Sequence, residues 1–124
     1  MKLYDIIQVE DSEDFIIPLA REAEKQAMSH LGVGSLNELE ETLVKNRAKV
    51  YVVDGRFPVK AGGEIDYLAL RAAEMIRNCD PEAKIMLYSA NDLSFVARKI
   101  NAEYASKGVL PDELMEKIKQ MIGK

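Results

Sequence analysis

The chain has 124 residues, 48% of them hydrophobic and 31% charged, and its formal net charge is -4. This length fits one ordinary domain, so we expect residues 1–124 to form a single domain. The basic residues are dispersed, which argues against direct nucleic-acid binding, and no apolar run approaches the ~20 residues that cross a bilayer. With no signal-peptide pattern and one cysteine, Cys79, we expect a cytoplasmic protein without membrane contact.

The first predicted strand, Leu3–Val9, runs directly into two acidic residues, Glu10 and Asp11. Ser12 follows and can cap a helix, because its hydroxyl can accept a backbone N–H of the first turn. Apolar residues then recur at helical spacing. Pro18 lies beyond the turn in which a missing N–H costs nothing, so we expect a delayed helix start or a kink just before it.

The segment His30–Gly34 predicts a short edge strand, although its two glycines weaken the pattern. His30 is the only histidine, and without a second ligand type around it we interpret it as a surface or packing residue. Ser35 and Glu38 have the spacing of a capping box. Leucines at helical spacing then predict a helix that ends near Asn46.

The apolar run Val50–Val53 is the strongest strand signal in the chain. Its residues are apolar on both faces of the pleat, which is typical of a strand covered by helices on both sides. Asp54 follows at once, so its carboxylate belongs where a buried strand reaches the surface. We expect Gly55–Pro58 to begin a loop, so Asp54 has no helix to cap.

The second half alternates in the same way. Apolar residues at helical spacing from Ile65 to Ile76 predict a helix of about four turns. Lys84–Tyr88 predicts another buried strand, which finishes at Ser89.

A short helix is predicted over Asn91–Ile100, and Ala102–Ser106 predicts a last strand that ends at Lys107. Pro111 suits the first position of a final helix. Five strand–helix repeats predict an α/β fold: a three-layer, doubly wound, parallel five-stranded sheet with right-handed crossovers.

In such a sheet every strand's carboxyl end lies at one edge, where ligands bind. That edge collects Glu10, Asp11, Asp54, Ser89 and Lys107. Carboxylates placed so close together favour a hard divalent cation, and Mg²⁺ suits carboxylates plus a phosphoryl oxygen. Asp54 is therefore a candidate nucleophile that would form an aspartyl phosphate, while Lys107 balances charge and Ser89 donates a hydrogen bond.

Four motifs in order resemble the receiver domain of two-component response regulators. They are VED at Val9–Asp11, VVDGRFP around Asp54, LYSA at Leu87–Ala90, and YASK at Tyr104–Lys107. Each motif alone would be weak evidence, but together they cover the ends of four predicted strands. The resemblance implies the flavodoxin-like receiver fold, with strand order 2-1-3-4-5, and a phosphoprotein of a phosphorelay.

The resemblance also implies a role for each residue of the acidic edge. Asp54 would be the phosphoacceptor, and Mg²⁺ would be bound by Asp11 with Glu10 in support and by the backbone carbonyl of Arg56. The protein would assist its own phosphotransfer and dephosphorylation and would not otherwise be an enzyme.

For the switch, the resemblance implies that Ser89 is the hydroxyl that moves, Tyr104 the aromatic residue that turns inward with it, and Lys107 the lysine that contacts the phosphoryl group. A histidine kinase or a phosphotransfer protein would supply that group. The downstream protein target stays open, and a homodimer is allowed.

Two departures from the family pattern concern the surface through which receiver domains normally signal their phosphorylation. The interval between Ser89 and Lys107 is shorter than usual, which predicts a shortened fourth helix, and Pro58–Arg77 is longer, which predicts a lengthened third helix or loop. Partner and dimer modes therefore cannot be transferred. The alternative function is a receiver-like protein-interaction module that works without phosphorylation.

Overall fold

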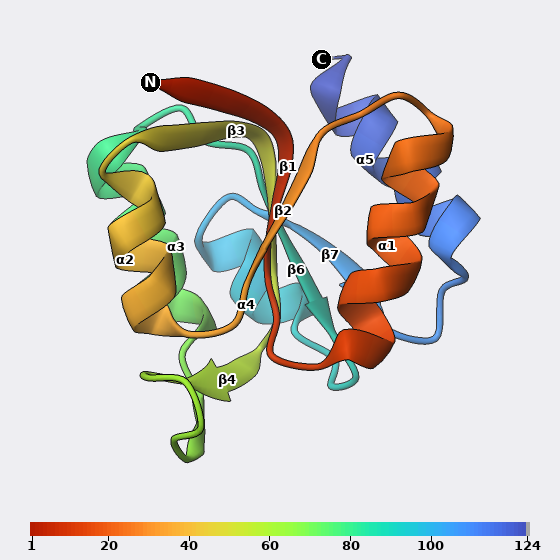
Figure 1. The fold of residues 1–124 in the computed structure, drawn as a ribbon. Helices are drawn as coiled ribbons and strands as arrows, with labels where there is room; N and C mark the ends of the chain where they lie inside the picture. The colour runs from red at the N-terminus through yellow and green to blue at the C-terminus, as the bar shows by residue number, and fades with distance from the viewer. Residues whose placement is uncertain (124) are drawn as a thin grey trace.

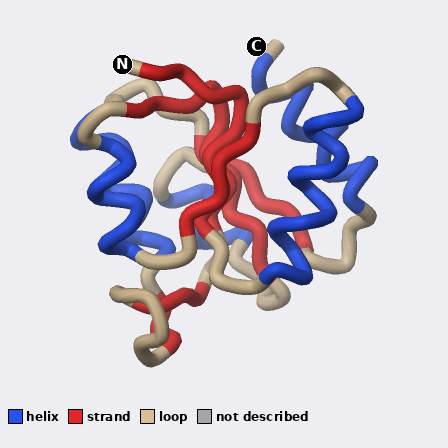
Figure 2. Tube along the Cα trace, viewed as in Figure 1, coloured by secondary structure: helices blue, strands red, loops and turns tan. Residues whose placement is uncertain are grey.

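The structure, a computed structural model, describes residues 1–123 and contains a five-stranded parallel sheet (Figures 1 and 2). The strand order is β2-β1-β3-β6-β7, which confirms the predicted order 2-1-3-4-5 of successive sheet strands. The sheet strands are β1 Lys2–Val9, β2 His30–Val33, β3 Asn46–Val53, β6 Ile85–Ser89 and β7 Glu103–Ser106.

Helices cover both faces of the sheet, giving the three predicted layers. Helices α1 and α5 pack on one face and α2, α3 and α4 on the other (Figure 1). Within residues 1–123, no helix combines the length and apolar character needed to cross a membrane. The helices are α1 Glu13–Lys25, α2 Leu36–Leu43, α3 Ala69–Cys79, α4 Ser94–Lys99 and α5 Pro111–Ile122.

Strand β3 lies at the centre of the sheet, between β1 and β6. Val50–Val53 are fully buried, as their double-faced apolar pattern predicts. Successive side chains alternate between the two layers: Tyr51 and Val53 join the core under α2 and α3, and Val50 and Val52 join the core under α1 and α5. This burial holds the end of β3, and hence Asp54, in a fixed position.

The predicted helix from Ile65 is wrong in its first turn, and the predicted loop at Gly55–Pro58 is also wrong. Arg56–Pro58 forms strand β4, which pairs antiparallel with strand β5, Ile65–Tyr67. Helix α3 begins only at Ala69. The chain reverses through Gly62, whose φ of 77° is accessible to glycine. Backbone pairing across this hairpin outweighs the helical spacing, and the additional residues extend the loop and not α3.

Helix α1 differs from its prediction near Pro18. It begins at Glu13 without delay and continues through Pro18 to Lys25. Ser12 occupies the N-cap position, but its side chain caps no backbone N–H within residues 1–123. The Ser12 N–H instead donates to Oε2 of Glu10 at 3.3 Å. The acidic residue before the cap therefore takes part in starting the helix.

Other helix boundaries differ from their predictions by a few residues. Helix α2 ends at Leu43, so Asn46 starts β3 and does not end the helix. The predicted cap at Ser35 is confirmed, since its hydroxyl accepts the Glu38 N–H at 3.1 Å. Helix α4 is short, as predicted, and starts only at Ser94 because Asp92 accepts the Ser94 N–H at 3.0 Å and holds the preceding turn.

Candidate functional site

Two neighbouring strands bring the predicted carboxylates together at the carboxyl edge of the sheet. The Asp54 N–H donates to the Val9 carbonyl at 2.9 Å, which holds the end of β3 against the end of β1. Carboxylate oxygens of Glu10, Asp11 and Asp54 all lie within 4.8 Å of one another. The predicted convergence of these three acids is therefore present, and the cluster could bind a metal.

Lys107 reaches this cluster from the end of β7. Its Nζ lies 2.7 Å from Oε1 of Glu10 and 3.2 Å from Oδ1 of Asp54. Its backbone N–H donates to the Ser89 carbonyl at 3.0 Å, which fixes the approach of the side chain. One ammonium group thus joins carboxylates from two strands.

Glu10 is the most buried acid of the cluster, with an exposed fraction of 1%. Burial raises its pKa to about 7; the Asp54 carboxylate adds to the rise, and Lys107 opposes it. Apart from the ion pair with Lys107, Oε1 of Glu10 accepts no hydrogen bond from the described residues. Asp11, by contrast, is exposed. The cluster therefore brings three carboxyl groups to one ammonium group among the described residues.

Ser89 lies beside the same edge, buried at the end of β6. Its Oγ accepts the Asn91 N–H at 3.1 Å. A Cβ atom placed on Gly55 would lie 3.0 Å from this Oγ and 2.8 Å from Cδ1 of Leu93. A side chain at this position would force Leu93 and Ser89 to move, so Gly55 allows β6 and its loop to approach the acid cluster closely.

Tyr104 and Arg56 lie at the margins of the site. The Tyr104 hydroxyl donates to the Asn91 carbonyl at 2.9 Å and lies 3.4 Å from the Ser89 carbonyl, so the half-buried ring is tied to the loop after β6. Arg56 begins β4 two positions after Asp54, and its exposed guanidinium lies 5.1 Å from the centroid of the Tyr67 ring. Its carbonyl as a metal ligand stays a prediction.

Sequence reasoning missed the aromatic residues around Lys107. Its Nζ lies 4.0 Å from the centroid of the Phe15 ring and 5.8 Å from that of Tyr88. The two rings meet edge to face at 5.9 Å. Tyr88 could have been found as the residue before Ser89 in the LYSA motif, whereas Phe15 reaches Lys107 only through the packing of α1. The rings form an apolar wall that attracts and orients the ammonium group.

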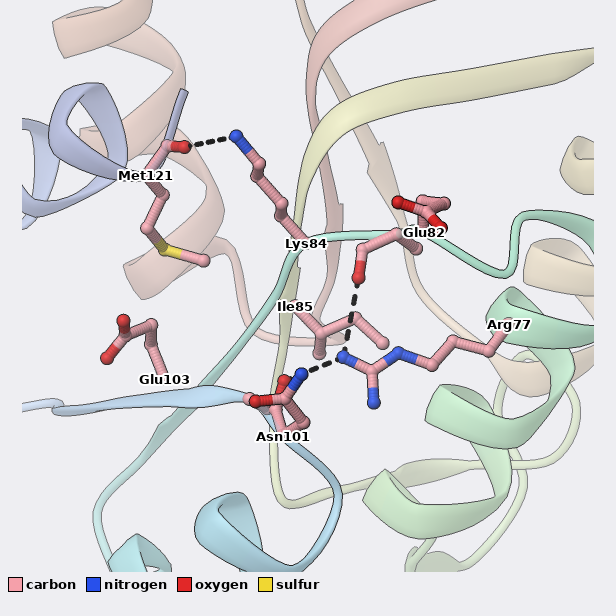
Figure 3. Close-up of a pocket in the computed structure, with 9 residues that line it drawn as sticks. Arg77, Glu82, Lys84, Ile85, Asn101, Glu103 and Met121 are labelled. Atoms are coloured by element: carbon pink, nitrogen blue, oxygen red, sulfur yellow. Dashed lines mark hydrogen bonds between the residues drawn. The ribbon is translucent and has the colours of Figure 1, made fainter. Parts of the chain in front are cut away.

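A separate cavity of about 250 Å³ lies at the opposite edge of the sheet (Figure 3). Its cationic side chains bind backbone: Nη2 of Arg77 donates to the carbonyls of Asn101 at 2.8 Å and Ala83 at 3.3 Å. Nζ of Lys84 donates to the Met121 carbonyl at 2.7 Å. These contacts join helix ends to strand starts, so we interpret the cavity as structural. The three acids of the candidate site do not line it.

The fold has close counterparts among solved structures, although no family model and no curated protein sequence matches the chain. A response regulator from Thermotoga maritima aligns at 23% identity and a TM-score of 0.79, covering 96% of this chain and 97% of that one. A CheY-like response regulator receiver domain protein from Methanospirillum hungatei JF-1 aligns at 18% and 0.80, covering 99% and 94%. The chain has the receiver fold of response regulators.

A third counterpart with this receiver fold extends over the whole chain. The non-phosphorylated HemR receiver domain from Leptospira biflexa aligns at 19% identity and a TM-score of 0.80, covering 100% of this chain and 96% of that one. The recognised resemblance therefore holds for the fold over nearly all residues, including the strands that carry Glu10, Asp54, Ser89 and Lys107.

Proposed function

We propose that residues 1–124 form one receiver domain that accepts a phosphoryl group on Asp54 and thereby switches its binding to a protein partner. The observation that carries this proposal is the convergence of Glu10, Asp11, Asp54 and Lys107 at one sheet edge. A carboxylate at the end of a rigid buried strand, beside an ammonium group, suits nucleophilic attack on a phosphoryl donor.

The donor set fits Mg²⁺, which prefers oxygen ligands and keeps several waters. Lys107 pairs with Oε1 of Glu10 and with Asp54, and Asp11 is exposed beside them, so three carboxyl groups converge on this ammonium group among the described residues. Glu10, Asp11, Asp54 and the Arg56 carbonyl would hold the ion. When bound, it would supply the charge neutralisation that a phosphoryl group needs on approaching carboxylates.

The chemistry then rests on three side chains. An Asp54 carboxylate oxygen attacks phosphorus, the bond between phosphorus and the donor atom breaks, and the donor leaves with the electron pair of that bond. Nζ of Lys107, which forms ion pairs with Glu10 and Asp54 in the structure, would form an ion pair with a phosphoryl oxygen instead. The Ser89 hydroxyl donates a hydrogen bond to a second phosphoryl oxygen, and this new bond would draw Ser89 and the loop after β6 toward Asp54.

The product of this reaction is a modified protein, so the domain acts as a signalling component and as an enzyme only toward its own phosphate. A histidine kinase or phosphotransfer protein in the cytoplasm is the proposed donor, and a protein target is the proposed reader. Phosphorylation acts by shifting the balance between two states of the Ser89 and Tyr104 loop region.

The decisive experiment is intact mass spectrometry after incubation with acetyl phosphate and Mg²⁺. We expect the wild type to gain one phosphoryl mass, and Asp54→Ala and an EDTA-treated sample to gain none. Asp66→Ala, which removes an exposed carboxylate on β5, is the matched control and should be phosphorylated like the wild type.

A second donor-independent measurement completes this test, because some receivers accept phosphate only from their own kinase. Beryllofluoride with Mg²⁺ should shift the amide resonances around Asp54, Ser89 and Tyr104 in wild type and not in Asp54→Ala. No mass gain together with no beryllofluoride response would overturn the proposal in favour of a phosphorylation-independent interaction module.

A further inference from the structure

A groove adjoins the site on the side of the β4–β5 hairpin, and we define it by two neighbouring cavities that share Leu70. The smaller, about 170 Å³, includes Gly55, Tyr67, Ser89 and Leu93 in its lining. The larger, about 580 Å³, extends from Leu70 along α3 and the end of α4. We call the two cavities together the α3–α4 groove.

The α3–α4 groove exposes apolar surface that the sheet core does not use. Of the residues that line it, Tyr67 is 72% exposed and Leu70 is 53% exposed. Contiguous apolar patches of this kind mark binding surfaces. An apolar cavity of about 150 Å³ is large enough for a benzene ring, so the smaller cavity accommodates one aromatic or large aliphatic side chain.

The charges of the groove are opposite in sign to those of the whole chain. Its charged lining consists of Arg56, Arg77, Lys99 and Glu74, an excess of cations, whereas the chain carries a net charge of -4. Arg56 lies over the Tyr67 ring, and Lys99 Nζ lies 4.7 Å from the centroid of the Phe95 ring.

Among the described residues, neither Arg56 nor Lys99 has a carboxylate within 4.0 Å. Their charges are therefore available to carboxylates of another molecule, while the Tyr67 ring and the small cavity provide apolar contact. This pairing of apolar pocket and unpaired cations is complementary to an acidic amphipathic segment.

We propose that the α3–α4 groove binds an acidic amphipathic helix of a partner protein, with one apolar side chain in the cavity beside Gly55 and Ser89. A helix suits the site because the groove runs along two helices of this chain, the geometry of helix-in-groove recognition. Carboxylates on the helix would pair with Arg56 and Lys99.

The docking itself is independent of phosphorylation, but its regulation rests on the proposed function. The side chain in the small cavity touches Gly55 and Ser89, which also flank Asp54. A change at Ser89 on phosphorylation therefore changes the shape of the cavity, and by linkage the bound helix changes the stability of the phosphorylated state by the same factor.

The test uses the full chain and a phage-displayed library of random 16-residue peptides. We expect selection of peptides rich in Asp and Glu, with apolar residues spaced three or four positions apart. The tightest-binding peptide is synthesised with a fluorophore. Its affinity for the Leu70→Glu variant should be about tenfold or more lower than for the wild type, and its affinity for Lys99→Glu severalfold lower. Anisotropy titration measures both, and circular dichroism checks that each variant folds.

Matched controls lie on other surfaces of the molecule. Val44→Glu replaces an apolar residue that is 71% exposed after α2, and Lys45→Glu reverses an exposed charge next to it. Both should bind the peptide like wild type. Selection of no peptide, selection of basic peptides, or binding that Leu70→Glu leaves unchanged would overturn the proposal, as would a self-association of the chain that Leu70→Glu abolishes.

Failure of this inference can be told apart from failure of the proposed function. If Asp54→Ala binds the peptide like wild type and the chain gains no phosphoryl mass, docking stands and the phosphoacceptor proposal falls. If the mass gain occurs and Leu70→Glu binds the peptide normally, phosphorylation stands and the groove proposal falls. Peptide affinity that differs between untreated and beryllofluoride-treated wild type supports the coupling, and equal affinity overturns it.

Discussion

At the amino edge of the sheet Arg77 and Lys84 bind backbone carbonyls, whereas at the carboxyl edge Lys107 binds the carboxylates of Glu10 and Asp54. The first arrangement satisfies acceptors at helix ends and strand starts. The second leaves several acids around one ammonium group. A cavity alone therefore does not identify a reactive site. The charged residues that line the amino-edge cavity are two cations and two acids, whereas three carboxyl groups surround Lys107 at the carboxyl edge.

The largest effect should come from Lys107→Met, which removes the ammonium group from the carboxyl edge. Glu10 would be left buried and unpaired, and breaking a buried ion pair in this way costs about 3 kcal/mol. Urea denaturation measures the loss at pH 8, where Glu10 of the wild type, with a pKa of about 7, is mostly ionised beside Lys107. Mass spectrometry should show little or no phosphorylation. Lys119→Met, at an exposed lysine of α5, is the control. A loss below about 1 kcal/mol would contradict the proposed pairing.

At the amino edge, Arg77→Met should reduce stability and leave the chemistry intact. The guanidinium donates to the carbonyls of Ile100, Asn101 and Ala83, and charged hydrogen bonds contribute about 1.5–3 kcal/mol. We expect a loss of about 2 kcal/mol in the free energy of unfolding, with phosphorylation of the folded fraction unchanged. Arg71→Met, on the exposed side of the same helix, should change stability little. Loss of phosphorylation in folded Arg77→Met would break the contrast between the two edges.

A smaller effect is expected from Gly55→Ala, which tests how closely the loop after β6 approaches Asp54. The added methyl group would lie 2.8 Å from Cδ1 of Leu93 and 3.0 Å from Oγ of Ser89, and overpacking of this kind costs about 1–3 kcal/mol. We expect a lower urea midpoint and slower phosphorylation. Gly34→Ala is the control, because its methyl group would have only ordinary contacts at 3.8 Å. Equal midpoints for the two variants would contradict the close packing.

The smallest effect should appear in the pH dependence of stability. Burial lowers the pKa of His30 below its reference of 6.5, so the unfolded chain takes up a proton at a higher pH than the folded one. The contribution of His30 to stability should therefore fall as the pH is lowered through 6.5, so the stability of the wild type relative to His30→Gln should decrease between pH 7.5 and 5.5. Glu10, whose raised pKa acts in the opposite direction, is common to both proteins and cancels in the difference. Parallel pH profiles would contradict the prediction.

The position of Asp54 could be predicted because it follows from local pattern. Val50–Val53 have no polar face, so that segment must be a strand covered by helices on both sides, and the residue after it must lie at the carboxyl edge of the sheet. The same reasoning placed Glu10, Ser89 and Lys107 at that edge. The convergence of the acidic residues could therefore be predicted from the sequence, and the receiver resemblance supplied the strand order.

The sequence by itself determined the alternation of strands and helices, since apolar periodicity reports which face of each element is buried. Only the tertiary structure decided the rest. The apolar spacing that starts at Ile65 suits a helix, yet pairing with Arg56–Pro58 turns it into a hairpin strand. Lys107 finds Glu10 and the Phe15 ring only when β7 and α1 are packed on the sheet. Such contacts join residues far apart in the chain, so their energies depend on the folded arrangement and not on local spacing.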